Sequence, residues 1–334
     1  MSYPYIVAVV VLSFAISIFC SYIIYRTGHK LSLIDIPTER SSHLYPTPRG
    51  GGIGIWLSFI VTGIFFTHQT VFTIIAGIIG LIGFVDDRVA LSAKVRLLFQ
   101  TVLSVIAITL FSGLPQTATA ALLFVLFIIF ITGTSNFYNF MDGINGIAGL
   151  TGVVAFGLLS FFSFFIRKEP EIALMSISLA SACLGFLPLN IPRAKVFMGN
   201  IGSIFLGFVF GSFVVKLSTD ISLVLCLIMF LSTFYADAVI TIFYRWEKGE
   251  NLMKAHRSHL YQYLSNELRL KHWMVSAIYA VVQFIVGLFA LSAYGKGLIW
   301  QLGVFSIFSI MFLLSYKVIK RISPPPLAGL RKQG

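Results

Sequence analysis

Charged residues are scarce in this sequence. Only 11% of the 334 residues are Asp, Glu, Lys or Arg, whereas ordinary soluble domains carry about 25%. Apolar residues make up 57%, and they form long runs, each about the length of a helix that crosses a bilayer core. A soluble protein could not bury so many runs, and they are too uniformly apolar for the strands of a membrane β-barrel. The sequence therefore predicts an all-α polytopic membrane protein.

Cysteine pairs, a cleavable leader and nucleotide-hydrolysis motifs are missing as well. Cys20, Cys183 and Cys226 lie inside apolar runs without a CxxC pair, which indicates small core residues rather than a disulfide framework. No basic residue precedes the first apolar run and no clean small-x-small site follows it, so we interpret residues 5–25 as a retained span. The lack of a GxxxxGK[ST] loop argues against ATP hydrolysis.

Ten or eleven membrane spans are predicted from the apolar runs. One candidate, residues 71–85, is short for a full crossing. The predicted spans are 5–25, 51–68, 71–85, 96–112, 117–134, 146–166, 171–189, 201–217, 220–244, 273–294 and 298–318.

Basic residues predict the orientation of these spans. With the N-terminus outside, 20 of the Lys and Arg side chains fall on the inner side and 4 on the outer side, as cytoplasmic loops require. This asymmetry explains the net charge of +12 without a nucleic-acid partner. We predict a multi-pass membrane protein with its N-terminus outside and its C-terminus in the cytoplasm. One catalytic domain spans residues 1–320, and a basic, disordered cytoplasmic tail spans 321–334.

Two adjacent acids end one of the apolar runs. Asp86 and Asp87 are costly to place there unless they have a task, such as metal binding or general-base chemistry on a phosphate. Lys94 and Arg96 follow in the same predicted loop and are candidates for holding phosphates. The alternative is a solvated turn.

A stripe of amides surrounds a lone carboxylate. Asn136, Asn139 and Asp142 are spaced by three residues, which places them on one helix face within an arc of roughly 120°. Asn145 follows in a glycine-rich stretch. This pattern suits a metal ion, a ribose or a base edge, and the alternative is an internal polar packing face.

Two glycine-rich segments open spans on the predicted inner side. Residues 197–203 read Phe-Met-Gly-Asn-Ile-Gly-Ser, and residues 46–52 read Pro-Thr-Pro-Arg-Gly-Gly-Gly, with His43 just ahead. Helix starts of this kind expose N–H groups to anions. The first signal alone is weak, and the second is also compatible with an interfacial hinge.

The longest predicted inner loop carries His256-Arg257-Ser258-His259. Zinc binding is an alternative there but lacks further ligands, whereas Arg257 favours contact with a phosphate or sugar. Asp237, within a span, is either functional or paired with a polar group on a neighbouring helix.

Together, these motifs resemble the polyprenyl-phosphate N-acetylhexosamine-1-phosphate transferases. The segments around Arg49, Asp86–Asp87, Asn139–Asp142 and Phe197–Ser203 occur in family order, and the resemblance runs from about residue 40 to 265. It implies that a polyprenyl phosphate oxygen attacks the sugar-bearing phosphate of a UDP-sugar and releases UMP, with Mg²⁺, or alternatively Mn²⁺, shielding the diphosphate.

The resemblance also implies a role for each motif residue. Asp86 and Asp87 correspond to catalytic acids, and Asn139 and Asn200 to metal ligands. The remaining roles are nucleotide binding by Asn136, Asp142, Asn145, Phe197 and Lys94, sugar-phosphate binding by His256, Arg257, Ser258 and His259, and lipid-phosphate binding by His43 and Arg49.

Two positions depart from the family pattern. The family usually carries aspartate at position 200, and many bacterial members carry it at 145, where this chain has Asn200 and Asn145. An amide oxygen can bind Mg²⁺ but offers no charge. Asn200 therefore implies an amide ligand, a weak metal site or an inactive chain.

Residues 255–262 resemble the branch that initiates O-antigen or capsule synthesis with UDP-GlcNAc, UDP-N-acetylfucosamine or UDP-N-acetylquinovosamine. The resemblance implies undecaprenyl phosphate as the acceptor and the bacterial cytoplasmic (inner) membrane as the location. A homodimer formed through apolar spans is compatible with the sequence. Two alternatives are an inactive homologue and a transporter or flippase of lipid-linked sugars. A transporter would need polar residues across the membrane, where Asp237 is the clear candidate.

Overall fold

The computed structural model describes residues 3–37, 42, 45–251 and 257–322, and it is predominantly helical. Its helices and strands are α1 (Tyr3–Thr27), β1 (Ile34–Asp35), β2 (Thr47–Pro48), α2 (Ile53–Phe65), α3 (Thr70–Val89), α4 (Ala93–Ser112), α5 (Ala118–Met141), α6 (Ile147–Phe161), η1 (Phe162–Arg167), α7 (Pro170–Phe186), η2 (Leu187–Leu189), α8 (Asn200–Leu217), α9 (Ile221–Ile228), η3 (Met229–Leu231), α10 (Ser232–Glu247), α11 (Leu260–Gln262), η4 (Tyr263–Glu267), α12 (His272–Tyr294) and α13 (Leu298–Ile322).

The predicted all-α membrane fold is confirmed. Within the described residues, 10 helical segments are long and apolar enough to cross a membrane. The predicted span at 51–68 is the shorter helix α2, which has only 13 residues. The segment at 71–85, expected to be short, is part of a helix of 20 residues that continues through Asp86 and Asp87. The paired acids therefore lie on the last turn of α3 and not in the loop after it.

Local sequence signals mark several helix ends. Ser92 caps α4 by accepting a hydrogen bond from the Val95 amide, and Thr117 caps α5 in the same way through Ala120. Pro170 occupies the first turn of α7, where the missing N–H costs nothing. Short connections between such ends force successive long helices to run in opposite directions.

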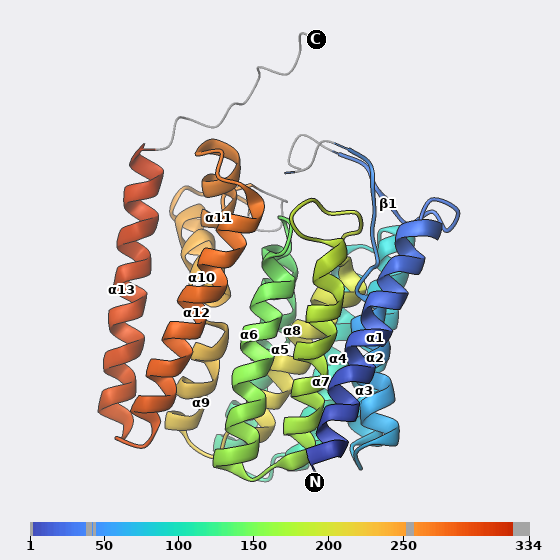
Figure 1. The fold of residues 1–334 in the computed structure, drawn as a ribbon. Helices are drawn as coiled ribbons and strands as arrows, with labels where there is room; N and C mark the ends of the chain where they lie inside the picture. The colour runs from blue at the N-terminus through green and yellow to red at the C-terminus, as the bar shows by residue number, and fades with distance from the viewer. Residues whose placement is uncertain (1–2, 38–41, 43–44, 252–256, 323–334) are drawn as a thin grey trace.

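This alternation gathers the polar motifs at one end of the bundle. The C-terminal ends of α3, α5 and α10 and the N-terminal ends of α4, α6 and α8 lie at the end that carries β1, opposite the N-terminus of the chain (Figure 1). There β1 pairs antiparallel with β2, and Arg49 forms a bridge with Phe197. Segments far apart in sequence therefore meet at this end.

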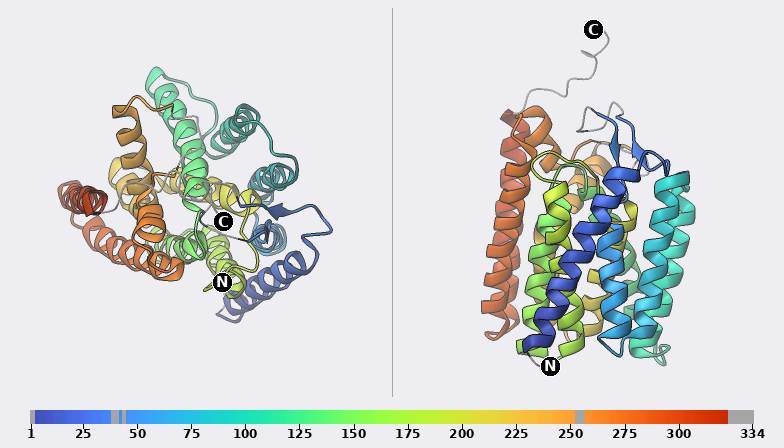
Figure 2. Two further views of the ribbon diagram at one scale, coloured as in Figure 1. Left: turned by 90° about the horizontal axis from the view of Figure 1, so that it is seen from above. Right: turned by 45° about the vertical axis from the view of Figure 1, so that its right-hand side comes forward.

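Helices α7 and α8 form the centre of the bundle. In their most apolar windows, 83% and 89% of the residues are buried, against 6% in α13. Seen from above, α13 lies at the periphery (Figure 2). Buried hydroxyls join α7 to α1 and α2, since Ser178 lies within hydrogen-bond distance of both Ser13 and Thr62. The exposed apolar side chains of the outer helices suit contact with lipid tails.

Close packing of α3 on α8 positions the paired acids, and Gly83 makes it close enough. A Cβ atom at residue 83 would lie 2.6 Å from the carbonyl oxygen of Asn200. Gly83→Ala is therefore expected to lower the free energy of unfolding by about 1–3 kcal/mol, the usual cost of overpacking. Thermal unfolding in detergent would measure it, with Gly133→Ala as the control, because a Cβ there meets nothing within 4 Å. Equal melting temperatures for the two variants would contradict this packing.

Candidate active site

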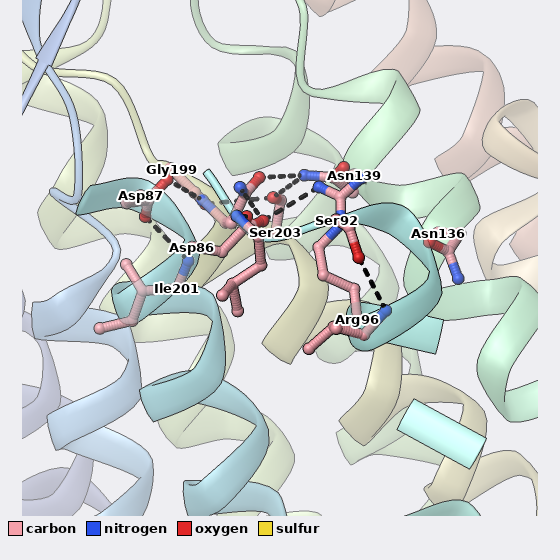
Figure 3. Close-up of polar contacts among 12 residues, drawn as sticks. Asp86, Asp87, Ser92, Arg96, Asn136, Asn139, Gly199, Ile201 and Ser203 are labelled. Atoms are coloured by element: carbon pink, nitrogen blue, oxygen red, sulfur yellow. Dashed lines mark hydrogen bonds and ion pairs between the residues drawn. The ribbon is translucent and has the colours of Figure 1, made fainter. Parts of the chain in front are cut away.

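Asp86 lies at the centre of a polar cluster at the motif-bearing end of the bundle (Figure 3). Its side chain is 3% exposed. Oδ2 accepts hydrogen bonds from Arg96 at 2.9 Å and from Nδ2 of Asn200 at 2.6 Å, and Oδ1 accepts one from the Leu91 amide at 2.7 Å. These donors offset the cost of burying a carboxylate at the negative end of the α3 dipole.

Asp87 caps the first turn of α8. Its Oδ1 accepts the Asn200 amide at 2.9 Å and its Oδ2 accepts the Ile201 amide at 3.2 Å. Gly199, with a φ of 76°, leaves room for this approach, since a Cβ there would lie 2.5 Å from Oδ2 of Asp87. Arg49 also donates to the backbone oxygen of Asp87. The carboxylate thus faces the positive end of the α8 dipole.

Asn139 and Asn200 meet beside the two acids. Nδ2 of Asn139 donates to Oδ1 of Asn200 at 2.7 Å and to Oγ of Ser203 at 2.9 Å. Asn200 is thus joined to Asp86 on one side and to Asn139 on the other. Four predicted site residues, from α3, α5 and α8, therefore form one connected cluster.

Asn136 lies apart from this cluster, as Figure 3 shows. Its Nδ2 donates to Oε1 of Gln100 at 2.6 Å and to the Thr132 oxygen at 2.8 Å, and Gln100 is only 2% exposed. The side chain therefore links α5 to α4. This contact of Asn136 agrees with the alternative interpretation of the amide stripe, an internal polar packing face.

Asp142 and Asn145 lie in the turn between α5 and α6. Burial raises the pKa of the Asp142 carboxyl well above its usual range, and the charges of Asp87 and Asp35 act in the same direction. A carboxyl that holds its proton can donate a hydrogen bond as well as accept one. Nδ2 of Asn145 donates to the backbone oxygen of Pro192 at 3.3 Å, and the backbone oxygen of Asn145 accepts from the Ser276 hydroxyl at 2.9 Å.

The glycine-rich segments meet through backbone hydrogen bonds. The amide of Phe197 donates to the Pro48 oxygen at 2.8 Å, and the Gly51 amide donates to the Phe197 oxygen at 2.9 Å. Nε of Arg49 is buried without a hydrogen-bond partner in the described structure. An orphaned guanidinium N–H at this end of the bundle is suited to a phosphate oxygen. His43 lies outside the described residues.

The remaining predicted residues are dispersed. Lys94, in the first turn of α4, is exposed. Arg257 pairs with Glu267 at 3.5 Å, and Oγ of Ser258 is buried without a partner in the described part of the chain. His259 is buried and lies 3.2 Å from Asp237. His256 is outside the described residues.

Three contacts were not expected from the sequence. Arg96, a candidate for holding phosphate, is paired with Asp86, while Gln100 and Ser203 bind the two asparagines of α5. Ser203 could have been found from the sequence, because it ends the glycine-rich motif 197–203 and lies in the first turn of α8, near Asn200. Gln100 carries no such signal, since only the packing of α4 on α5 brings it to Asn136.

The cluster offers oxygen ligands to a divalent cation. Asp86 and Asp87 supply carboxylates and Asn139 and Asn200 supply amide oxygens, the ligand type that Mg²⁺ prefers. In the described residues, no group of three or more His, Cys, Asp or Glu could hold a metal ion. A magnesium ion beside the two carboxylates would take amide oxygens as further ligands, and the Asn200 amide, whose Nδ2 faces Asp86, would have to turn over to offer its oxygen. With that turn the residues fit a magnesium ion.

Comparison with known proteins agrees with this geometry. The model of the family described as glycosyl transferase family 4 matches residues 69–218, the stretch that holds both acids, Asn139 and Asn200. The chain is 27% identical over 311 residues to a probable undecaprenyl-phosphate N-acetylglucosaminyl 1-phosphate transferase of Bacillus subtilis, covering 87% of this chain and 85% of that protein.

Two further relatives extend the comparison. An undecaprenyl-phosphate alpha-N-acetylglucosaminyl 1-phosphate transferase of Thermotoga maritima is 27% identical over 58% of this chain and 60% of its own length. A phospho-N-acetylmuramoyl-pentapeptide-transferase of Staphylococcus epidermidis is 30% identical over 73% of this chain and 84% of its own length. The resemblance seen in the motifs is thereby confirmed. The chain belongs to the polyprenyl-phosphate sugar-1-phosphate transferases of glycosyl transferase family 4, and it is a membrane phosphotransferase that acts on a polyprenyl phosphate.

Proposed function

We propose that the chain transfers an N-acetylhexosamine-1-phosphate from a UDP-sugar to undecaprenyl phosphate at the cytoplasmic face of a bacterial inner membrane. The observation that carries the proposal is the cluster of Asp86, Asp87, Asn139 and Asn200 at one end of the bundle. The distribution of basic residues supports placing that end in the cytoplasm.

The reaction exchanges one phosphoanhydride for another. An oxygen of the lipid phosphate attacks the sugar-bearing phosphorus, the bond from that phosphorus to the UMP oxygen breaks, and UMP leaves with the electron pair. Phosphoryl transfer of this kind needs positioning and charge stabilisation above all. Bound Mg²⁺ would shield the charge of the diphosphate.

The side chains of the protein divide these tasks. Asp86, held by Arg96 and Asn200, is placed to position the lipid phosphate or to take its proton. Asp87 holds the N-terminus of α8, so its role is to fix Asn200 beside Asp86. Nε of Arg49 and Oγ of Ser258 are buried donors without partners in the described structure, and we assign them to phosphate oxygens. Phe197, Asp142 and Asn145 are the candidates for the uridine side.

An N-acetylhexosamine without a peptide is the donor sugar we favour. The B. subtilis and T. maritima relatives are named for N-acetylglucosamine, whereas the S. epidermidis relative is named for a muramoyl-pentapeptide. Residues 255–262 resemble the branch that starts O-antigen or capsule synthesis. UDP-GlcNAc and UDP-N-acetylfucosamine or quinovosamine are therefore the first donors to test.

Release of UMP by the purified protein tests the proposal. The protein in detergent is given undecaprenyl phosphate, Mg²⁺ and one UDP-sugar at a time, including the muramoyl-pentapeptide donor. We expect UMP from one N-acetylhexosamine donor, only when lipid phosphate is present, and none after EDTA treatment. UMP from the pentapeptide donor alone would replace the proposed role with cell-wall synthesis, and no UMP from any donor would contradict the proposed reaction.

A further inference from the structure

Asp237 is fully buried within α10 and is saturated by hydrogen bonds from three helices. Oδ1 lies 3.1 Å from the Thr241 hydroxyl, 3.2 Å from Nδ1 of His259 and 2.9 Å from the Leu260 amide. Oδ2 accepts from the Tyr261 amide at 3.2 Å and from the Tyr279 hydroxyl at 2.7 Å. A carboxylate inside a membrane bundle is costly unless it is satisfied in this way. Every one of these groups can donate, so the site is built for a carboxylate.

Two of these donors are the first amides of α11. Helix starts leave such amides without partners, and Asp237, 23 and 24 residues earlier in the chain, supplies the cap for Leu260 and Tyr261. The carboxylate accepts only, so in the tautomer that carries its hydrogen on Nδ1 the His259 ring donates to Asp237, and this bond fixes the orientation of the ring. Asp237 thereby fastens the start of the cytoplasmic segment Arg257–Glu267 to the bundle.

The same segment reaches the active-site end of α5. The rings of His259 and Tyr261 stack with centroids 5.7 Å apart. The Tyr261 hydroxyl donates to the Phe140 oxygen at 3.0 Å, one residue after Asn139. A Cβ on Gly143 would overlap the Tyr261 hydroxyl. A shift of α11 would therefore move groups on both sides of the turn that holds Asp142.

We propose that Asp237 is a positioning residue that holds His259 and Tyr261 and so presents the segment Arg257–Glu267 to the diphosphate of the donor. This proposal rests on the transferase function proposed above. Asp237 itself touches no substrate, and it acts through the two residues that it holds. The lipid phosphate, which we assign to the Asp86 and Arg49 side of the site, should not sense its loss.

Asp237→Asn tests this role, because the NH₂ group of an asparagine would face N–H or O–H donors and could not accept their hydrogen bonds. We expect kcat/KM for the UDP-sugar to fall by about 10–100-fold, the usual cost of losing a group that orients a ligand-binding histidine. Most of the loss should appear in the KM for the donor, with the KM for undecaprenyl phosphate unchanged. Asp220→Asn is the matched control, since Asp220 also caps a helix, through the Leu223 amide, but is exposed at the far end of the bundle. Equal losses for both substrates would overturn the positioning role.

Two substitutions of His259 separate the bond to Asp237 from the rest of the ring. Asparagine places an N–H near the position of Nδ1, whereas glutamine places one near Nε2. If Asp237 acts through Nδ1, Asp237→Asn combined with His259→Gln should be no worse than either change alone. Losses that multiply in the double variant would show that the two residues act independently, which contradicts the proposal.

Trypsin cleavage after Arg257 gives a readout that needs no catalysis. Asp237→Asn and His259→Gln should speed cleavage several-fold, while His259→Asn and Asp220→Asn should cleave at the rate of the unchanged protein. If the unchanged protein releases no UMP, the transferase function fails, yet this assay still decides whether Asp237 holds the segment. An unchanged cleavage rate for Asp237→Asn overturns the proposal.

Discussion

Asp87→Asn is expected to lower the rate of UMP release by about 100-fold, the upper end of the cost of losing a group that orients an active-site ligand. Both oxygens of Asp87 accept backbone amides of α8, so an asparagine must turn its NH₂ group toward one of those N–H donors. That conflict costs about 1–3 kcal/mol as an unsatisfied buried donor. The change also removes a negative charge from the site. Steady-state assays with the preferred donor would measure the effect.

The control for this variant is another aspartate that accepts a backbone amide at a helix start but lies away from the cluster. Asp220 caps α9 through the Leu223 amide at 2.9 Å and is far from the cluster along the helix axis. Asp220→Asn should keep nearly full activity. Activity of Asp87→Asn close to that of Asp220→Asn would contradict the placement of Asp87 in the active site.

Asn200→Asp is expected to make the stability of the protein depend on a divalent cation. The Asn200 amide donates to Asp86 at 2.6 Å, and a carboxylate there would replace this bond with repulsion between a half-buried acid and the buried Asp86. Without a cation, the melting temperature should therefore fall. With Mg²⁺ it should recover, because an additional charged oxygen ligand strengthens the site, and we expect an affinity gain of about 10-fold, or about 1.4 kcal/mol.

Thermal unfolding with EDTA and with increasing Mg²⁺ would measure this dependence, and binding of Mn²⁺ followed by electron paramagnetic resonance would report affinity directly. Asn266→Asp is the control, since it adds the same charge at a side chain that bonds to Ser42 and not to Asp86. A variant at position 200 that melts at the same temperature with and without Mg²⁺ would show that the cation does not use this residue.

The predictions from the sequence differ from the structure where a side chain contacts a residue far away in the chain. The apolar runs predicted the membrane helices because each membrane-spanning helix is formed by one run of consecutive apolar residues. The spacing of Asn136, Asn139 and Asp142 predicted one helix face; the two asparagines do lie on α5, but Asp142 follows its last residue, Met141. Spacing also does not show how far each side chain lies from the end of the bundle. Asn136, one turn further from the end than Asn139, therefore faces Gln100 on α4 instead of joining the acids.

The contacts that join Asp86, Asp87 and Asn139 to Asn200 link residues 61 to 114 positions apart. Asn200 is separated from Asp86 by 114 residues, and no local pattern records that pairing. The sequence indicated a shared site only because it placed acids and amides at helix ends that were predicted to face the same side of the membrane. Asp237 was recognised as either functional or paired, and the structure confirms the pairing, with His259 and Tyr279.

The fate of the sugar-bearing phosphate tests the central claim most directly. A UDP-sugar carrying ³²P in that phosphate is incubated with the purified protein, Mg²⁺ and undecaprenyl phosphate, and the organic and aqueous phases are separated. We predict that the label moves into the lipid fraction as a diphosphate-linked sugar in step with UMP release, and that Asp87→Asn slows both by the same factor. Label that appears in water as free sugar phosphate, or that stays in the intact donor, would contradict a transferase at this site.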